Sequence, residues 1–213
     1  MKRAEKMQPS EDLFSKEQFQ RLVEFQNTLI NWNRNISLTS VPSEEIMRRL
    51  ALPSAWLGKE YYRHNLGVVV DFGAGAGIPG IPMAICDERN RYVLIDSNKK
   101  KIEFIKACIS SEEIGIKGNA QARAERIVKG KWKEKVNVVV TRGTGTILSI
   151  LDIWADKIDK QGFIDIFKGE KLDLEVAEML KKYPKAEYEK IPVPEWFDTL
   201  KLIRIKGIAS KSA

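Results

Sequence analysis

Glycines crowd the stretch Val68 to Pro82, VVVDFGAGAGIPGIP, directly after an acidic residue. A run of valines leads to Asp71, and glycines follow at positions 73, 75, 77 and 80. Because glycine has no side chain and tolerates positive φ, such a turn between a strand and a helix brings the backbone close to a ligand. The turn could hold the phosphates of a dinucleotide, or an adenosyl cofactor that has none.

The dinucleotide interpretation has a literal match. Gly75, Gly77 and Gly80 spell G-x-G-x-x-G. Asp96 ends the next hydrophobic run, about 20 residues beyond, where an acid would bind a ribose. A lone match of this kind is a weak signal. A nicotinamide-dependent oxidoreductase therefore stays as an alternative.

Three details favour S-adenosylmethionine, which carries a cationic sulfonium and ammonium but no phosphate. Asp71 would repel a pyrophosphate, yet it could accept hydrogen bonds from an ammonium group or its waters. Gly73 extends the glycine pattern back to this acid. Pro79 and Pro82 remove amide donors from the first turn of the following helix, where a phosphate would need them. Asp96 suits the ribose hydroxyls equally well.

Two kinds of segment must position these residues. Residues 15–32 have helical apolar spacing, with Ser15 and Gln18 as a capping box, and a second helix is expected after Ser43 with a break at Pro53. We expect residues 1–60 to form an N-terminal helical extension and residues 61–213 one compact domain. From Leu66 on, Val- and Ile-rich strands alternate with amphipathic helices, which predicts a parallel α/β sheet. The last two strand-like segments, AEYEKIPV and LKLIRIK, are expected to form an antiparallel pair at one edge.

Composition sets limits on the function. The 213 residues carry a net charge of +7, which is compatible with a nucleic-acid partner. No apolar run reaches the roughly 20 residues of a membrane helix, and the N-terminal residues do not resemble a secretory signal, so we expect a cytoplasmic protein. Cys86 and Cys108 are too few for a disulfide framework or a zinc cluster, and we expect no metal. His64 is the only histidine, which makes a Ser-His-Asp mechanism unexpected.

The order and spacing of four segments resemble the RsmG (GidB) family of bacterial 16S rRNA guanine-N7 methyltransferases. The segments are DFGAGAGIPGIPMAI, LIDSNKKKIEFI, ARAE and VVVTRG, and the most specific element is Ile-Pro-Gly-Ile-Pro at residues 78–82. WNRNISLTS and FKGE match further family segments, so the resemblance covers residues 19–206. It implies a Rossmann-like class I methyltransferase fold: a mostly parallel seven-stranded sheet with an antiparallel edge strand.

The resemblance also implies a site. Gly73 and Ile78 would flank the methionyl part of S-adenosylmethionine, next to Asp71 and Gly75, and Asp96 would bind the ribose. The other implied residues are Ala124 and Glu125 beside the adenine and Arg142 at the mouth of the site. Guanine N7 carries no proton, so its methylation needs orientation and no general base. Arg142 is our candidate catalytic residue, since arginine commonly binds guanine O6.

The implied partner is 16S ribosomal RNA or the small ribosomal subunit, bound by a monomer. Candidate RNA contacts are basic residues near the expected mouth: Arg48, Arg49, Lys100, Lys101 and Lys168. Trp132 stands among four lysines in KGKWKEK, residues 129–135. It would be either a stacking platform for bases or a core residue beneath a solvated turn.

Several family positions differ in this chain, mostly on the expected substrate side. Arg48-Arg49 stands where the family has Arg-His, Leu52-Pro53 where it has Asp-Ser, and Ser37 where it has the first residue of Asn-Leu-Thr. TRGT replaces SRAF at residues 141–144, and Thr199-Leu200 replaces an Arg-His. A methyltransferase with another RNA target and a non-catalytic RNA-binding relative are therefore further alternatives.

Overall fold

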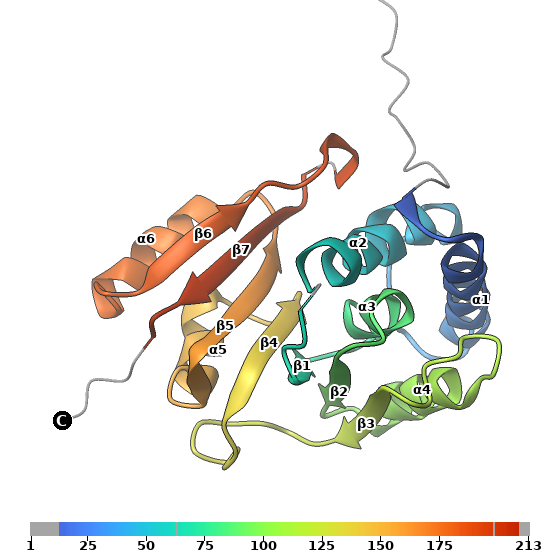
Figure 1. The fold of residues 1–213 in the computed structure, drawn as a ribbon, viewed down its shortest axis with the longest axis horizontal. Coiled ribbons are helices and arrows are strands. Elements are labelled where there is room, and N and C mark those ends of the chain that lie inside the picture. Colours follow the sequence, from blue (N-terminus) through green and yellow to red (C-terminus); the bar gives the residue numbers. More distant parts are fainter. Residues whose placement is uncertain (1–12, 63, 198, 209–213) are drawn as a thin grey trace, which may run out of the picture.

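A seven-stranded sheet forms the centre of the computed structural model, which describes residues 13–62, 64–197 and 199–208. The strand order is β3-β2-β1-β4-β5-β7-β6 (Figure 1). The strands are β1 (Val68–Phe72), β2 (Arg91–Asp96), β3 (Ala120–Ala124), β4 (Val136–Arg142), β5 (Ile158–Lys168), β6 (Glu187–Ile191) and β7 (Lys201–Lys206). The first five strands run parallel, as the alternation of strand-like and helix-like segments predicted.

The C-terminal antiparallel pair is confirmed. β7 pairs antiparallel with both β5 and β6, so β7 is the reversed strand and lies one position inside the edge. β6 forms the edge itself, and four of its five residues are exposed, with only Ile191 buried. Exposed charged side chains on an edge strand discourage pairing with other chains.

Helices cover both faces of the sheet because the strand side chains alternate between two cores. In β1, Val69 packs with the core under the N-terminal helices and Val70 with the core on the other face. The first face is covered by α1 (Lys16–Asn33), α2 (Leu52–Tyr61), α3 (Gly80–Cys86) and α4 (Lys99–Ser110). The second is covered by α5 (Ile147–Trp154) and α6 (Leu172–Lys182).

The N-terminal helices begin and break at the expected signals. Ser15 and Gln18 form the predicted capping box of α1. The second helical region starts with a 3-10 turn at Ser43–Glu45, widens into a π-helical turn at Met47–Ala51 and continues as α2. Pro53 is the second residue of α2, so the predicted break takes the form of a π turn just before it.

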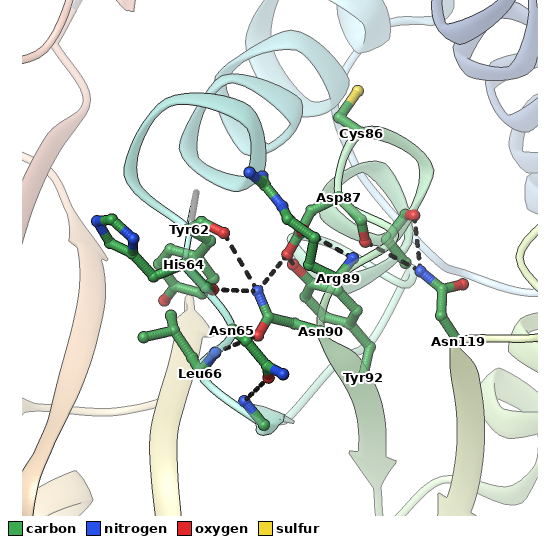
Figure 2. A network of polar contacts seen from close by, with 12 residues as sticks. Tyr62, His64, Asn65, Leu66, Cys86, Asp87, Arg89, Asn90, Tyr92 and Asn119 are labelled. Atoms are coloured by element: carbon green, nitrogen blue, oxygen red, sulfur yellow. Dashed lines mark hydrogen bonds and ion pairs between the residues drawn. The ribbon is translucent and has the colours of Figure 1, made fainter.

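A buried polar network ties the end of α2 to the amino ends of β1 and β2 (Figure 2). The side-chain amide of Asn90 donates to the carbonyl of Tyr62 and to Oδ2 of Asp87, at 3.2 and 2.6 Å. Tyr92 donates its hydroxyl to the same Asp87 oxygen at 2.8 Å. Because these groups are buried and paired, they fix how the N-terminal helices sit on the sheet. The carboxyl ends of the strands lie at the opposite edge.

Candidate functional site

The glycine turn between β1 and α3 presents open backbone at its centre. Gly73, Gly75 and Gly77 have φ values of 73, 53 and 71°, which side-chain-bearing residues rarely adopt. A Cβ on Gly73 would lie 2.3 Å from Oγ1 of Thr144, whereas a Cβ on Gly75 would meet nothing closer than 3.7 Å. Gly75 therefore faces free space, and Gly73 lets a neighbouring loop pack against the turn.

The first turn of α3 has no amide left for a phosphate. Gly80 donates to Oδ2 of Asp71 at 2.8 Å. The amides of Ile81 and Met83 donate to carbonyls within the same turn, at 2.8 and 3.2 Å, and Pro82 has no amide. Phosphate sites at helix N-termini depend on free amides. The turn thus fits an adenosyl cofactor without phosphates better than a dinucleotide.

Asp71 lies beneath the cavity floor and is fully buried. It caps the turn of α3 through Oδ2, while Oδ1 is buried without a partner among the described residues. The pKa of this carboxyl is raised to about 7: burial is the main cause, the hydrogen bond from Gly80 opposes it, and the nearby charge of Asp96 adds to it. Asp71 is absent from the cavity lining, so its contact with a cofactor would be indirect.

Asp96 ends β2 beside the glycine turn. Its Oδ2 accepts from the amide of Gly75 at 2.9 Å and its Oδ1 from the amide of Asn98 at 2.8 Å. Each carboxylate oxygen has two lone pairs, so one on each remains for a diol. Ala124 pairs with Asp96 across the strands, and the amide of Glu125 donates to the Asp96 carbonyl at 3.0 Å.

These residues open onto a cavity of about 590 Å³ at the carboxyl ends of β1, β2 and β4. Of the predicted site residues, the cavity is lined by Gly73, Gly75, Ile78, Asp96, Lys101, Glu125 and Arg142. Those outside the lining are Asp71, Ala124, Arg48, Arg49, Lys100 and Lys168. Two sides can be distinguished: the glycine wall, formed by residues 73–78 with Asp96, and the arginine wall, formed by residues 142–144.

Arg142 gives the arginine wall its charge. Its Nη2 donates to the main-chain carbonyl of Arg49 at 2.8 Å, and its guanidinium carbon lies 5.8 Å from the ring centroid of Phe167. Its Nη1 is buried and has no partner among the described residues. Burial, together with the nearby charge of Arg49, lowers the pKa of Arg142 to about 10, so the group stays cationic at neutral pH.

The predicted RNA contacts have different surroundings. Lys100 is exposed, Arg48 is half-buried, and Arg49 forms an ion pair with Glu45 at 2.6 Å. Lys168 is the most enclosed: its Nζ lies 2.7 Å from Oε2 of Glu175, and the side chain is 11% exposed. Lys168 also donates to the carbonyl of Gly145 at 2.7 Å, within the loop that follows Arg142.

Trp132 belongs to the core, which decides between its two interpretations. It is 7% exposed, and its ring centroid lies 5.4 Å from that of Trp154. The guanidinium of Arg123 lies over its ring at 5.5 Å. The surrounding lysines form the solvated turn, and the tryptophan is no stacking platform.

The sequence did not reveal several lining residues. Leu38 and Thr39, from the segment after α1, line the cavity, and both amides donate to Oδ1 of Asn33 at 2.8 and 3.0 Å. Asn33 belongs to the family-like segment WNRNISLTS, and this segment is the one feature of the sequence that points to Leu38 and Thr39. Arg126 and Thr144 also line the cavity. Their roles depend on tertiary neighbours that no local pattern specifies.

Comparisons with known proteins agree with this geometry. A family model described as GidB, rRNA small subunit methyltransferase G, matches residues 18–201. The chain is 28% identical over 198 residues to ribosomal RNA small subunit methyltransferase G of Haemophilus influenzae, covering 90% of this chain and 92% of the relative. It is 28% identical over 165 residues to the protein of that name from Clostridium novyi, covering 76% and 68%. The fold resembles an S-adenosylmethionine-dependent methyltransferase from Aquifex aeolicus, with a TM-score of 0.57 at 14% identity over 84% of this chain and 96% of that one.

Proposed function

The chain belongs to the rRNA small subunit methyltransferase G (GidB) family, and on this premise we propose that it methylates N7 of a guanine in 16S ribosomal RNA. Membership confirms the resemblance stated from the sequence and makes the protein an S-adenosylmethionine-dependent methyltransferase. One observation carries the proposal: a single cavity joins an adenosyl-compatible glycine wall to a wall with an unpaired guanidinium nitrogen.

The glycine wall fits S-adenosylmethionine. Gly73, Gly75 and Ile78 would lie along the methionyl part, because Gly75 offers backbone with open space in front of it. Asp96 would accept from the ribose hydroxyls through the lone pairs that its two amide contacts leave free. The adenine would lie beside Ala124 and Glu125. Ala124 is the residue on β3 that pairs with Asp96 of β2, and Glu125 comes directly after it. Asp71 would act from beneath by holding the turn of α3.

The arginine wall would orient the target base. S-adenosylmethionine, when bound, supplies an electrophilic methyl group on a sulfonium. Guanine N7 has an in-plane lone pair and no proton, so the chain has no base to provide. Nη1 of Arg142 is buried without a partner among the described residues, and a small movement of the side chain toward the cavity would let it donate to guanine O6, the usual acceptor for arginine on this base. Because Arg142 is largely shielded from water, a hydrogen bond that it donates is stronger than one from an exposed arginine.

The basic residues around the mouth would bind RNA phosphates. Lys101 lines the cavity and Lys100 lies exposed beside it at the start of α4. Arg48 and Arg49 would contribute from the second helical region, whereas Lys168, whose charge Glu175 neutralises, would support the loop after Arg142 rather than bind a phosphate. Cationic contacts of this kind make RNA binding fall as salt rises.

We propose that the protein works as a cytoplasmic monomer on free 16S RNA or on the small subunit. Among the residues that the structure describes, no helix has the length and apolar character to cross a membrane.

Transcribed 16S RNA and purified small subunits lacking the modification test the activity. Incubation with the enzyme and labelled S-adenosylmethionine should yield N7-methylguanosine in a nucleoside digest read by mass spectrometry. RNA binding without any methylated nucleoside would instead support the non-catalytic alternative. In a parallel thermal-shift measurement, adenosylhomocysteine should stabilise the protein and NADH should not; stabilisation by NADH alone would contradict the methyltransferase assignment.

Arg142→Ala tests the assigned catalytic residue. We expect kcat to fall about 100-fold, because a buried charge-assisted hydrogen bond to the base is lost. The affinity for adenosylhomocysteine should change less than threefold, as the glycine wall is untouched. Full turnover by this variant would exclude Arg142 from the reaction.

A further inference from the structure

The second helical region contains a break that faces the reaction cavity. Pro53 has no amide hydrogen, and an α-helix would need that amide to donate to the carbonyl of Arg49, four residues earlier. The chain widens into the π turn Met47–Ala51 just before the proline, where the amide of Leu52 donates to the carbonyl of Met47. The carbonyl of Arg49 therefore lacks the donor that a regular helix would give it.

The missing donor is replaced from a distant part of the chain. Nη2 of Arg142 donates to the Arg49 carbonyl at 2.8 Å, across 93 positions of sequence. The side chain of Arg49 is engaged elsewhere, since its Nη1 lies 2.6 Å from Oε2 of Glu45. The main chain of Arg49 thus forms the contact to Arg142.

This contact fixes Arg142 without neutralising it. A carboxylate partner would pair with the guanidinium and weaken its attraction for an electron-rich ligand. A carbonyl holds one nitrogen by a hydrogen bond and leaves the positive charge in place. The remaining Nη1 is buried, has no partner among the described residues and belongs to a side chain that lines the cavity.

We propose that Pro53 is a positioning residue for methyl transfer: by freeing the Arg49 carbonyl, it gives Arg142 a neutral anchor that holds the guanidinium at the cavity wall, where the target base would lie. The inference rests on the proposed function and assigns a role to a position where this chain differs from its family. A serine at that position would have an amide able to donate to the same carbonyl.

Pro53→Ala restores the amide and keeps a helix-compatible residue. We expect the new amide to compete for the Arg49 carbonyl, so that Arg142 loses its fixed direction. Turnover should fall about tenfold while KM for S-adenosylmethionine changes less than twofold. The melting temperature should stay the same or rise, because alanine favours a regular helix. Pro53→Ser serves as a second variant with the same amide and a different side chain.

A double-mutant cycle decides whether Pro53 acts through Arg142. In the Arg142→Ala background, Pro53→Ala should have no further effect on kcat, since the group it positions is absent. Independent, multiplicative losses in the double variant would overturn the proposal. Pro192→Ala, at an exposed loop position after β6, controls for the loss of a proline elsewhere and should leave kcat unchanged.

A measurement without turnover separates this inference from the proposed function. In protein labelled with ¹⁵N-arginine, Nη protons of Arg142 should exchange slowly in the wild type and rapidly in Pro53→Ala, with Arg142→Ala identifying the signal. Unchanged exchange in Pro53→Ala would overturn the anchor. A wild type that makes no N7-methylguanosine would contradict the proposed function, whatever the exchange shows.

Discussion

The glycine wall and the arginine wall of the cavity differ in what holds them in place. The glycine wall is fastened by main-chain amides: Gly73 and Ala74 both donate to the carbonyl of Ile95 at 2.9 Å, and Gly75 donates to Asp96 at 2.9 Å. The arginine wall is fastened by long cationic side chains that reach main-chain carbonyls. Arg142 binds the carbonyl of Arg49, and Lys168 binds that of Gly145.

Because they are held differently, the two walls should respond differently to substitution. A wall made of backbone depends on the absence of side chains and on φ, so one added methyl group disrupts it. A wall held by long side chains depends on anchors far away in the sequence and tolerates changes that keep those anchors. We expect substitutions in the glycine wall to weaken cofactor binding and substitutions in the arginine wall to reduce turnover.

Gly73→Ala should have the largest effect on the cavity. Its Cβ would lie 2.3 Å from Oγ1 of Thr144, at a φ of +73°. We expect the affinity for adenosylhomocysteine to fall at least about 100-fold and the free energy of unfolding to fall by ~2 kcal/mol. Calorimetric titration and urea unfolding measure the two. Gly118→Ala is the matched control, because a Cβ there meets nothing within 4 Å. Normal binding by Gly73→Ala would show that the two walls do not interlock at this point.

Asp96→Asn should weaken cofactor binding about 30-fold, or ~2 kcal/mol, by replacing charge-assisted hydrogen bonds with neutral ones. The carboxylate accepts from the glycine turn on one oxygen and from Asn98 on the other, so both the ribose site and the turn depend on it. Calorimetry with adenosylhomocysteine measures the loss. Asp173→Asn, at an exposed acid on α6, should bind as the wild type does. Equal affinities for Asp96→Asn and wild type would remove Asp96 from the site.

The sequence predicted the glycine wall better than the arginine wall, for a physical reason. Asp71, the glycines and the prolines lie within 12 consecutive positions, 71–82, and their effects are local: positive φ, missing amides and a cap on the next turn. Even there, the position of Asp71 in the motif did not reveal that its side chain is buried outside the cavity lining.

The arginine wall depends on contacts between distant segments. The family pattern identifies Arg142, but the carbonyl that anchors its side chain lies 93 positions away in the sequence. The charge of Lys168 makes it a candidate RNA contact, whereas in the structure its side chain pairs with Glu175 on the next helix. Charge and periodicity are properties of short windows, so they do not specify which carbonyl or carboxylate a long side chain reaches.

Lys168→Met distinguishes two roles for this residue: support of the loop that follows the arginine wall, and binding of RNA. We expect the loop after Arg142 to loosen as the Gly145 and Glu175 contacts are lost, with kcat reduced about fivefold and cofactor affinity unchanged. The salt dependence of RNA binding should keep its wild-type slope, whereas Lys100→Met should lower that slope by about 1. If Lys168→Met lowered the slope and kept a normal kcat, Lys168 would be an RNA contact and would not be needed to hold the loop.

Asp71→Asn should have the smallest effect on ligand binding and still reveal how the glycine wall is supported. Asp71 lies outside the cavity lining, so we expect adenosylhomocysteine affinity to change less than threefold. Its folded pKa of about 7 lies above the ordinary value of 3.8, because burial disfavours the charged form.

Between those two pH values the folded protein keeps a proton that the unfolded chain has released, so rising pH favours unfolding. The free energy of unfolding of the wild type should therefore fall relative to that of Asp71→Asn as the pH rises from 4 to 8, by up to ~4 kcal/mol at about 1.4 kcal/mol per pKa unit. Urea unfolding at intervals of pH measures the difference. Parallel curves for the two proteins would mean that Asp71 ionises normally. Water or a cation from the cavity would then have to reach the carboxylate through the glycine wall.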